Sequence, residues 1–212
     1  MRRIHLFSFM VGVVLAAMSV AGQQRDPKQY QQVLENPERV AALQVDKVIA
    51  TLGVTAGTRV ADLGAGTGIF TIPLARAVGQ TGKVYAIDID PGLLAIVTGK
   101  ARTAGLTNVT TVVAGDTNPR VPEPVDLLFI CDTLHHLPGQ SEYVKQFKGL
   151  LRPGGRVVVI EFAPGKWPAG HESFMVLPDQ VDGWMQTAGF LRVEAHGFLE
   201  TNFFHVYRMA RD

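Results

Sequence analysis

The sequence is poor in cysteine, in aromatic residues and in charge of either sign. Cys131 is the one cysteine among 212 residues, which excludes an intrachain disulfide and any metal site built from several cysteines. Lysine and arginine number 20 against 19 acidic residues, and no basic run is present. Because binding to nucleic acid depends on neutralising phosphates, this charge pattern argues against nucleic acid as a partner.

The overall amino-acid composition is that of a folded domain. Hydrophobic residues make up 47% of the chain and charged residues 18%, which is typical of globular proteins and not of disordered ones. A length of 212 residues suffices for one well-cored domain and hardly for two. The sequence carries no internal repeat, and it gives no expectation for the oligomeric state.

The first 22 residues differ from the rest. Arg2 and Arg3 precede an apolar stretch from Ile4 to Ala21, after which the chain turns polar. An apolar helix of this length would be about 27 Å long, which is borderline for spanning a bilayer. Residues 1–22 therefore have two interpretations, a cleaved signal that exports the protein to the periplasm or the medium, and an uncleaved membrane anchor. No other membrane contact is expected.

Apolar strand-like runs alternate with helical patterns along the remaining chain. Strands are predicted at 58–63, 83–87, 109–114, 126–131, 156–162, 191–195 and 203–209. Helices are predicted at 69–78, 91–104, 141–151 and 179–188, after one or two helices within 26–52. This alternation predicts an α/β, Rossmann-like sheet of seven mostly parallel strands with helices on both faces. The short final connection requires the last strand to be antiparallel. We divide the chain into an N-terminal helical lid over 23–56 and a ligand-binding domain over 57–212.

A glycine-rich turn follows the first predicted strand. Asp62 ends the strand, and Gly64, Gly66 and Gly68 come at alternate positions. Glycine permits positive φ and leaves no Cβ between the main chain and a ligand, while the following helix offers unpaired N–H groups. Many nucleotide-binding folds use such a turn, so the ligand depends on the residues that follow.

Polar side chains also end the next three predicted strands. They are Asp88 with Asp90, Asp116, and Asp132 with His135 and His136. Asp88 lies twenty residues after Gly68, where a carboxylate can accept both hydroxyls of a ribose, and Asp116 can accept from an amine such as that of adenine. Each aspartate alone is equally well explained as a helix cap or turn residue. Their occurrence at consecutive strand ends favours one shared ligand site.

In order and spacing, these motifs resemble the class I S-adenosylmethionine-dependent methyltransferases, from about Leu34 to the C-terminus. The resemblance is carried by Val60–Gly68, Tyr85–Asp88, Ala114–Asp116, Asp126–Leu137 and Leu150–Gly155. The His135-His136 pair and the Leu-Leu-Arg-Pro-Gly-Gly turn are most similar to the group around the quinone-biosynthesis C-methyltransferases. No Asn-Pro-Pro-Tyr follows the fourth strand, which disfavours methylation of adenine or glutamine amines.

The resemblance implies that S-adenosylmethionine is the cofactor and that the methyl acceptor is a small molecule. It implies that the methionine end lies in the loop that contains Asp62, Gly64, Ala65, Gly66 and Gly68. The ribose would lie at Asp88 and the adenine between Ile89 and the pair Asp116 and Thr117, while Asp132 would lie near the sulfonium. Acceptor walls are expected from Tyr30, from Arg39 and from the loop at 166–177.

In-line methyl transfer depends mainly on alignment, which can lower a barrier by roughly 7–11 kcal/mol. A base is needed only if the acceptor must lose a proton. His136, His135 and Asp132 are the candidates, although packing beneath the loop or hydrogen bonding to backbone is the favoured role for the two histidines. No metal is expected, because no further ligand accompanies these three side chains.

Two other functions remain open on the sequence. One is a non-catalytic S-adenosylmethionine-binding protein, because export would separate the protein from cofactor made in the cytosol. The other is an NAD-dependent oxidoreductase. Against the latter, the glycine turn lacks the two-residue gap of G-x-G-x-x-G, and Asp62 would place a negative charge near a pyrophosphate.

Overall fold

The structure is a computed structural model that describes residues 26–168 and 172–210. The signal or anchor expected over residues 1–22 lies outside the described residues. Within the part of the chain that is described, no helix is both long enough and apolar enough to cross a membrane.

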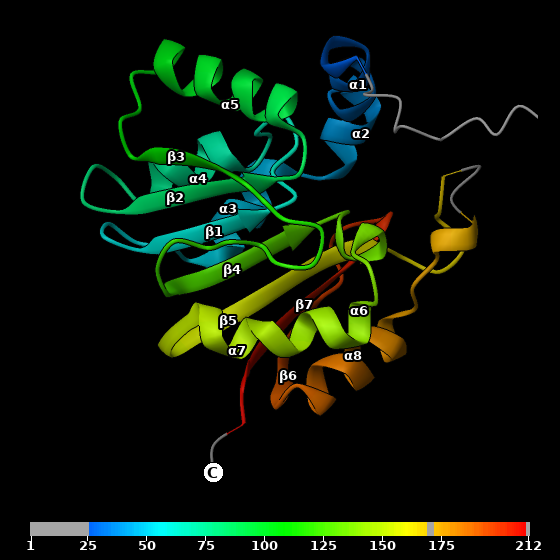
Figure 1. The fold of residues 1–212 in the computed structure, drawn as a ribbon. Coiled ribbons are helices and arrows are strands. Elements are labelled where there is room, and N and C mark those ends of the chain that lie inside the picture. Colours follow the sequence, from blue (N-terminus) through cyan, green and yellow to red (C-terminus); the bar gives the residue numbers. More distant parts are fainter. Residues whose placement is uncertain (1–25, 169–171, 211–212) are drawn as a thin grey trace, which may run out of the picture.

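A seven-stranded sheet with the order β3-β2-β1-β4-β5-β7-β6 forms the centre of the molecule (Figure 1). Its strands are β1 (Arg59–Leu63), β2 (Lys83–Asp88), β3 (Val109–Val113), β4 (Val125–Cys131), β5 (Leu151–Phe162), β6 (Phe190–His196) and β7 (Asn202–Met209). Neighbours among β1 to β5 are parallel, and β7 is antiparallel to both β5 and β6. The predicted fold class, including the antiparallel last strand, is confirmed.

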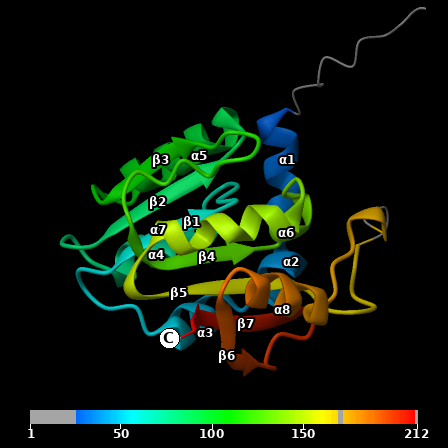
Figure 2. The ribbon, with the colours of Figure 1, turned by 60° about the horizontal axis from the view of Figure 1, so that its bottom comes forward.

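Helices cover both faces of the sheet (Figure 2). Alternate residues of β4 point to opposite faces, so Leu127 and Phe129 pack with α3 (Val45–Leu52) and α4 (Thr71–Ala77). Leu128 and Ile130 pack on the other face with α6 (Gln140–Tyr143), α7 (Phe147–Leu150) and α8 (Pro178–Thr187). Burial on both faces explains why the sequence of this strand is almost entirely apolar. On the β2 side, α5 (Pro91–Thr103) packs on the same face as α4.

The N-terminal region forms three helices where one or two were predicted: α1 (Pro27–Leu34), α2 (Pro37–Ala42) and α3. Asn36 starts α2 by accepting from the amides of Glu38 and Arg39, and Gln44, at φ 42°, separates α2 from α3. Helix α3 buries Val48 and Leu52, whereas α1 and α2 bury no residue. The lid over 23–56 stays a prediction, and polar contacts between α1–α2 and the domain are described below.

Two further elements differ from the predicted ones. The helix expected at 141–151 is α6 and α7 joined by the 3₁₀ turn η2 (Val144–Gln146). The predicted turn at 152–155 lies inside β5, where the pairing with β4 shifts from Val125–Leu151 to Leu127–Arg156. The loop that follows β5 contains the short turn η3 (Glu172–Phe174), which projects from the same edge of the molecule as α1 (Figure 1).

Candidate functional site

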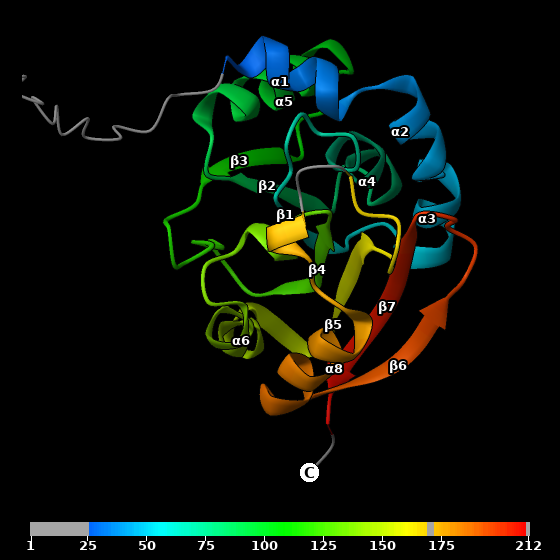
Figure 3. The same ribbon diagram turned by 90° about the vertical axis from the view of Figure 1, so that its right-hand side faces the viewer.

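A cavity of about 740 Å³ lies at the carboxyl ends of β1 to β4, beneath α1 and α2. Figure 3 looks onto this edge of the sheet. Nine of the twelve predicted site residues line it: Asp62, Gly64, Ala65, Gly66, Asp88, Ile89, Asp116, Asp132 and His136. Three do not, because Gly68 lines a more open hollow between α1–α3 and α4–α5, while Thr117 and His135 line neither space. The roles assigned to all twelve residues stay predictions.

The glycine loop is shaped by its backbone angles and by its attachment to β2. Gly64, Gly66 and Gly68 have φ of 79°, 54° and 84°, a region that L-residues with side chains avoid. The amides of Gly64 and Ala65 donate to the carbonyl of Ile87 at 2.8 and 3.0 Å. The loop therefore lies across the end of β2 and presents bare backbone to the cavity.

Two carboxylates, the buried Asp62 and the half-buried Asp88, lie beside this loop. Asp62 accepts from the hydroxyl of Thr71 at 2.5 Å, and burial raises the pKa of its carboxyl to about 7. The two oxygens of Asp88 accept from the amides of Gly66 at 2.8 Å and Asp90 at 3.0 Å, and burial raises the pKa of Asp88 as well. This half of the cavity concentrates negative charge, which favours a ligand that carries positive charge or several hydrogen-bond donors.

Asp90, by contrast, has a structural role, because it caps α5 by accepting from the amides of Gly92 and Leu93 at 2.7 and 3.4 Å. Asp116 is exposed at the cavity mouth, just beyond the end of β3. All of these strand-end carboxylates line the cavity, and Asp90 differs from the others because its side chain caps a helix.

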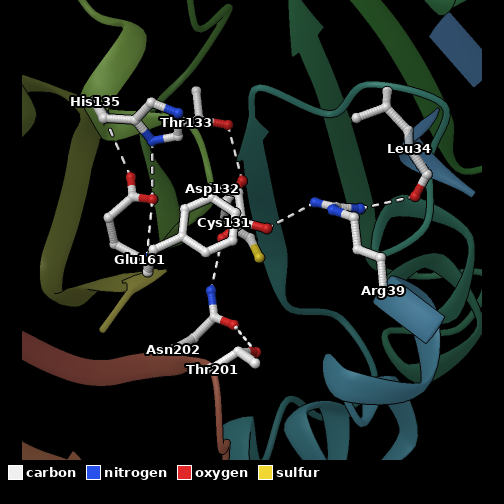
Figure 4. Close-up of polar contacts among 10 residues, drawn as sticks. Leu34, Arg39, Cys131, Asp132, Thr133, His135, Glu161, Thr201 and Asn202 are labelled. Atoms are coloured by element: carbon white, nitrogen blue, oxygen red, sulfur yellow. Dashed lines mark hydrogen bonds and ion pairs between the residues drawn. The ribbon is translucent and has the colours of Figure 1, made fainter. Parts of the chain in front are cut away.

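Asp132 occupies the other half of the cavity and is held from two sides (Figure 4). Its Oδ2 accepts from Nη2 of Arg39 at 2.7 Å, and its Oδ1 accepts from Nδ2 of Asn202 at 2.7 Å. The side chain is 6% exposed, and burial raises the pKa of its carboxyl to about 6 even though Arg39 opposes the rise. Arg39 also donates from Nη1 to the carbonyl of Leu34 at 2.8 Å, so one side chain joins α1, α2 and the end of β4.

A second polar contact joins α1 to the domain on the glycine-loop side. Nζ of Lys100 lies 2.6 Å from Oε1 of Glu35 and donates to the carbonyl of Thr67 at 2.9 Å. Helices α1 and α2 bury no residue, and these contacts, together with the Arg39–Asp132 pair, attach them to the walls of the cavity.

The two neighbouring histidines face different surroundings. Nδ1 of His135 lies 2.9 Å from Oε1 of Glu161, with both side chains buried (Figure 4). The His135 ring packs edge-on against Trp167, with the ring centroids 5.1 Å apart. Burial raises the pKa of the Glu161 carboxyl to about 7. His136 lines the cavity, and its ring centroid lies 5.6 Å from that of Phe174. Of the two, His136 alone faces the space that a ligand can enter.

Glu161 and Asn202 belong to the site but are not among the residues predicted from the sequence. A charged residue within the apolar run of β5 was a signal for Glu161, since a buried carboxylate needs a partner. Asn202 starts β7 and meets Asp132 across 70 residues, and no local pattern indicates that contact. Within residues 26–168 and 172–210, no group of three histidine, cysteine, aspartate or glutamate side chains is placed to hold a metal ion.

The chain is similar in sequence and in fold to known methyltransferases. Residues 60–155 match the family described as "Methyltransferase domain". Demethylmenaquinone methyltransferase of Staphylococcus aureus (strain JH9) is 37% identical over 130 residues, which are 60% of this chain and 53% of the relative. The chain thus spans about half the length of the curated relatives it matches.

Solved structures agree on the fold. A SAM-dependent methyltransferase from Aquifex aeolicus has a TM-score of 0.76 at 24% identity, with 87% of this chain and 99% of that chain covered. The magnesium protoporphyrin IX methyltransferase from Synechocystis PCC 6803, with bound SAM, has a TM-score of 0.64 at 20% identity over 89% of this chain and 86% of that one. At such identities the likeness establishes the architecture.

Proposed function

Because the chain belongs to the class I S-adenosylmethionine-dependent methyltransferases, we propose that it transfers a methyl group from S-adenosylmethionine to a small-molecule acceptor in the cavity at the ends of β1 to β4. The observation that carries the proposal is the convergence of Asp62, Asp88 and a bare glycine loop on one half of a cavity that leaves a second half for an acceptor. The name of the Staphylococcus aureus relative supports a small-molecule acceptor.

The hydrogen-bonding groups in this half of the cavity fit S-adenosylmethionine better than they fit a dinucleotide. S-adenosylmethionine carries an ammonium and a sulfonium, and the carboxylates of Asp62, which is buried, and Asp88, which is half-buried, attract cations and accept from hydroxyls. A pyrophosphate at the same place would meet two negative charges. Gly64 and Gly66 bring main chain to the cavity surface without a Cβ, which suits close approach of a ligand.

We assign Asp62 to the ammonium end, Asp88 to the ribose and Asp116 to the adenine amine. Ile89 lines the cavity but is 70% exposed, so an adenine ring can cover its apolar surface. Gly68 and Thr117, which lie outside the cavity, would support the loops and not contact the cofactor. His136 would face the acceptor.

When bound, S-adenosylmethionine supplies an electrophilic methyl group on a cationic sulfur. The protein contributes alignment of the nucleophile and exclusion of water, for which α1 and α2 cover the cavity through Tyr30, Leu34 and Arg39. Where the acceptor must lose a proton, Asp132 and His136, which both line the cavity, are the candidate bases.

Calorimetric titration tests the assignment of the cofactor. We expect S-adenosylmethionine and S-adenosylhomocysteine to bind and NAD to give no heat of binding, because the cavity is acidic where a pyrophosphate would lie. Binding of NAD alone would establish the oxidoreductase instead. Formation of S-adenosylhomocysteine in the presence of phenols, quinols or amines then separates an enzyme from a non-catalytic binding protein.

The affinity for S-adenosylmethionine should rise with pH. Below about pH 7 the Asp62 carboxyl, whose pKa burial raises to about 7, is largely protonated and neutral; above it the ionised form attracts the cofactor's ammonium. Titrations between pH 5.5 and 8 should therefore show affinity that increases through pH 7 and levels above it. Asp62→Asn should bind more weakly and with a flatter pH dependence; an equally steep dependence in this variant would remove Asp62 from the proposal.

For residues 1–22 we propose export, with membrane anchoring by the same segment as the alternative. The mass of the protein recovered from its native cells separates the two, because cleavage removes about 22 residues. Recovery of the uncleaved chain from the soluble cytosol would contradict both.

A further inference from the structure

Beyond the cofactor half, apolar and aromatic side chains line much of the cavity, and one ion pair lies among them. Leu43, Tyr143, His136 and Phe174 line this acceptor half. The Arg39–Asp132 pair is the charged group among them, and both of its members line the cavity. A buried ion pair contributes little net stability, so its presence at a cavity wall suggests a role in recognition.

We propose that Arg39 and Asp132 together bind the methyl acceptor and that this acceptor is a phenol, an aromatic compound whose hydroxyl receives the methyl group. The inference rests on the proposed methyl transfer, because it names the class of acceptor used by the same site.

The pair presents a donor and an acceptor side by side. Nη2 of Arg39 and Oδ2 of Asp132 lie 2.7 Å apart, and a carboxylate oxygen retains a further lone pair. A hydroxyl can donate to the carboxylate and accept from the guanidinium at the same time, whereas an ether can only accept. A protonated amine can only donate, so it would leave the guanidinium of Arg39 without an acceptor. The rings of Phe174, Tyr143 and His136 offer flat apolar surfaces, which suit an aromatic body on that hydroxyl.

Both members of the pair are fixed by other contacts. The carbonyl of Leu34 orients the guanidinium of Arg39 at 2.8 Å, and the amide of Asn202 holds Oδ1 of Asp132 at 2.7 Å (Figure 4). Asp132 itself has φ of 48°, a conformation that a non-glycine residue keeps only where its surroundings impose it. Asn202 is therefore a positioning residue, and Arg39 and Asp132 are the groups that touch the acceptor.

The chemistry balances without any further reactant. The hydroxyl oxygen forms the new bond to the methyl carbon, the carbon–sulfur bond breaks with its electron pair going to sulfur, and the hydroxyl proton passes to the Asp132 carboxylate and then to water. Arg39 stabilises the negative charge that develops on the oxygen. Burial raises the pKa of Asp132 to about 6, which makes it a better proton acceptor than an exposed carboxylate.

Binding of 4-nitrophenol and of its methyl ether, 4-nitroanisole, tests this proposal in the presence of S-adenosylhomocysteine. We expect the wild-type protein to prefer the phenol by about 10-fold or more, since a charge-assisted hydrogen bond is worth roughly 1.5–3 kcal/mol. Arg39→Gln and Asp132→Asn should bring the ratio close to one, because each variant should lower the affinity for the phenol more than the affinity for the ether. The visible absorption of bound nitrophenol should show more phenolate in wild type than in Arg39→Gln.

Arg59→Gln is the matched control, because Arg59 pairs with Glu123 at 3.4 Å at the amino end of β1, far from the cavity. Its phenol preference should equal that of wild type. Arg39→Lys, which keeps the charge, provides a second variant should Arg39→Gln fold poorly, and it should retain part of the preference. Equal affinity for the two compounds, or binding of neither by a protein that binds S-adenosylhomocysteine, would overturn the phenol assignment and leave the methyltransferase. Failure to bind S-adenosylhomocysteine would instead refute the proposed function.

Discussion

Replacing Gly64 with alanine should abolish cofactor binding and lower the free energy of unfolding by about 2–6 kcal/mol. Gly64 has φ of 79°, where an L-residue is strained, and its added Cβ would collide with the side chain of Thr133. The loop can relieve that collision only by moving away from the cavity. Urea denaturation measures the stability, and calorimetric titration with S-adenosylhomocysteine measures the binding.

Two further variants separate strain from collision. Gly99→Ala in α5 is the control, because its added methyl meets nothing within 4 Å and lies in a helix, where alanine is favoured by about 1 kcal/mol. Adding Thr133→Gly to Gly64→Ala removes the collision but keeps the backbone strain, so binding should return in part. Normal affinity in the single variant Gly64→Ala would mean that this loop does not contact the cofactor.

Replacing Asp88 with alanine should weaken S-adenosylmethionine binding by about 100-fold or more. Two hydrogen bonds from ribose hydroxyls to a carboxylate would contribute roughly 1.5–3 kcal/mol each, and both would be lost. The variant also loses the acceptor for the Gly66 amide, which holds the glycine loop at 2.8 Å. Calorimetry with S-adenosylmethionine and with S-adenosylhomocysteine should show the same loss, because the two ligands share the ribose.

Asp126→Ala provides the comparison for this effect. Asp126 also accepts from a backbone amide, that of Arg59 at 2.8 Å, and pairs with Arg152 at 3.0 Å, but it lies at the opposite end of the sheet. Its removal should lower stability and leave affinity unchanged. Asp88→Asn, which keeps one acceptor oxygen, should fall between wild type and Asp88→Ala. If Asp88→Ala binds as tightly as Asp126→Ala, the ribose does not lie at β2.

Most of the architecture, and the place of the site within it, followed from the sequence. Alternating apolar runs and helical patterns define parallel strands with crossovers, and parallel strands must end at one edge, so Asp62, Asp88 and Asp116 had to lie near each other. The boundaries of the N-terminal helices did not follow, because the break at Gln44 depends on how α3 docks on the core and not on a helix-breaking residue.

The amino-acid sequence by itself determined the doubly covered sheet and the acidic, glycine-lined edge, because both arise from local periodicity and from the geometry of parallel strands. Only the tertiary structure decided which polar groups meet. Arg39 reaches Asp132 across 93 residues, Asn202 completes that pair from the last strand, and His135 turns to Glu161 while His136 faces the cavity. Such contacts depend on how separate elements pack against each other. They also depend on the directions in which the side chains of His135 and His136 point from a single 3₁₀ turn. No local pattern of residues encodes either.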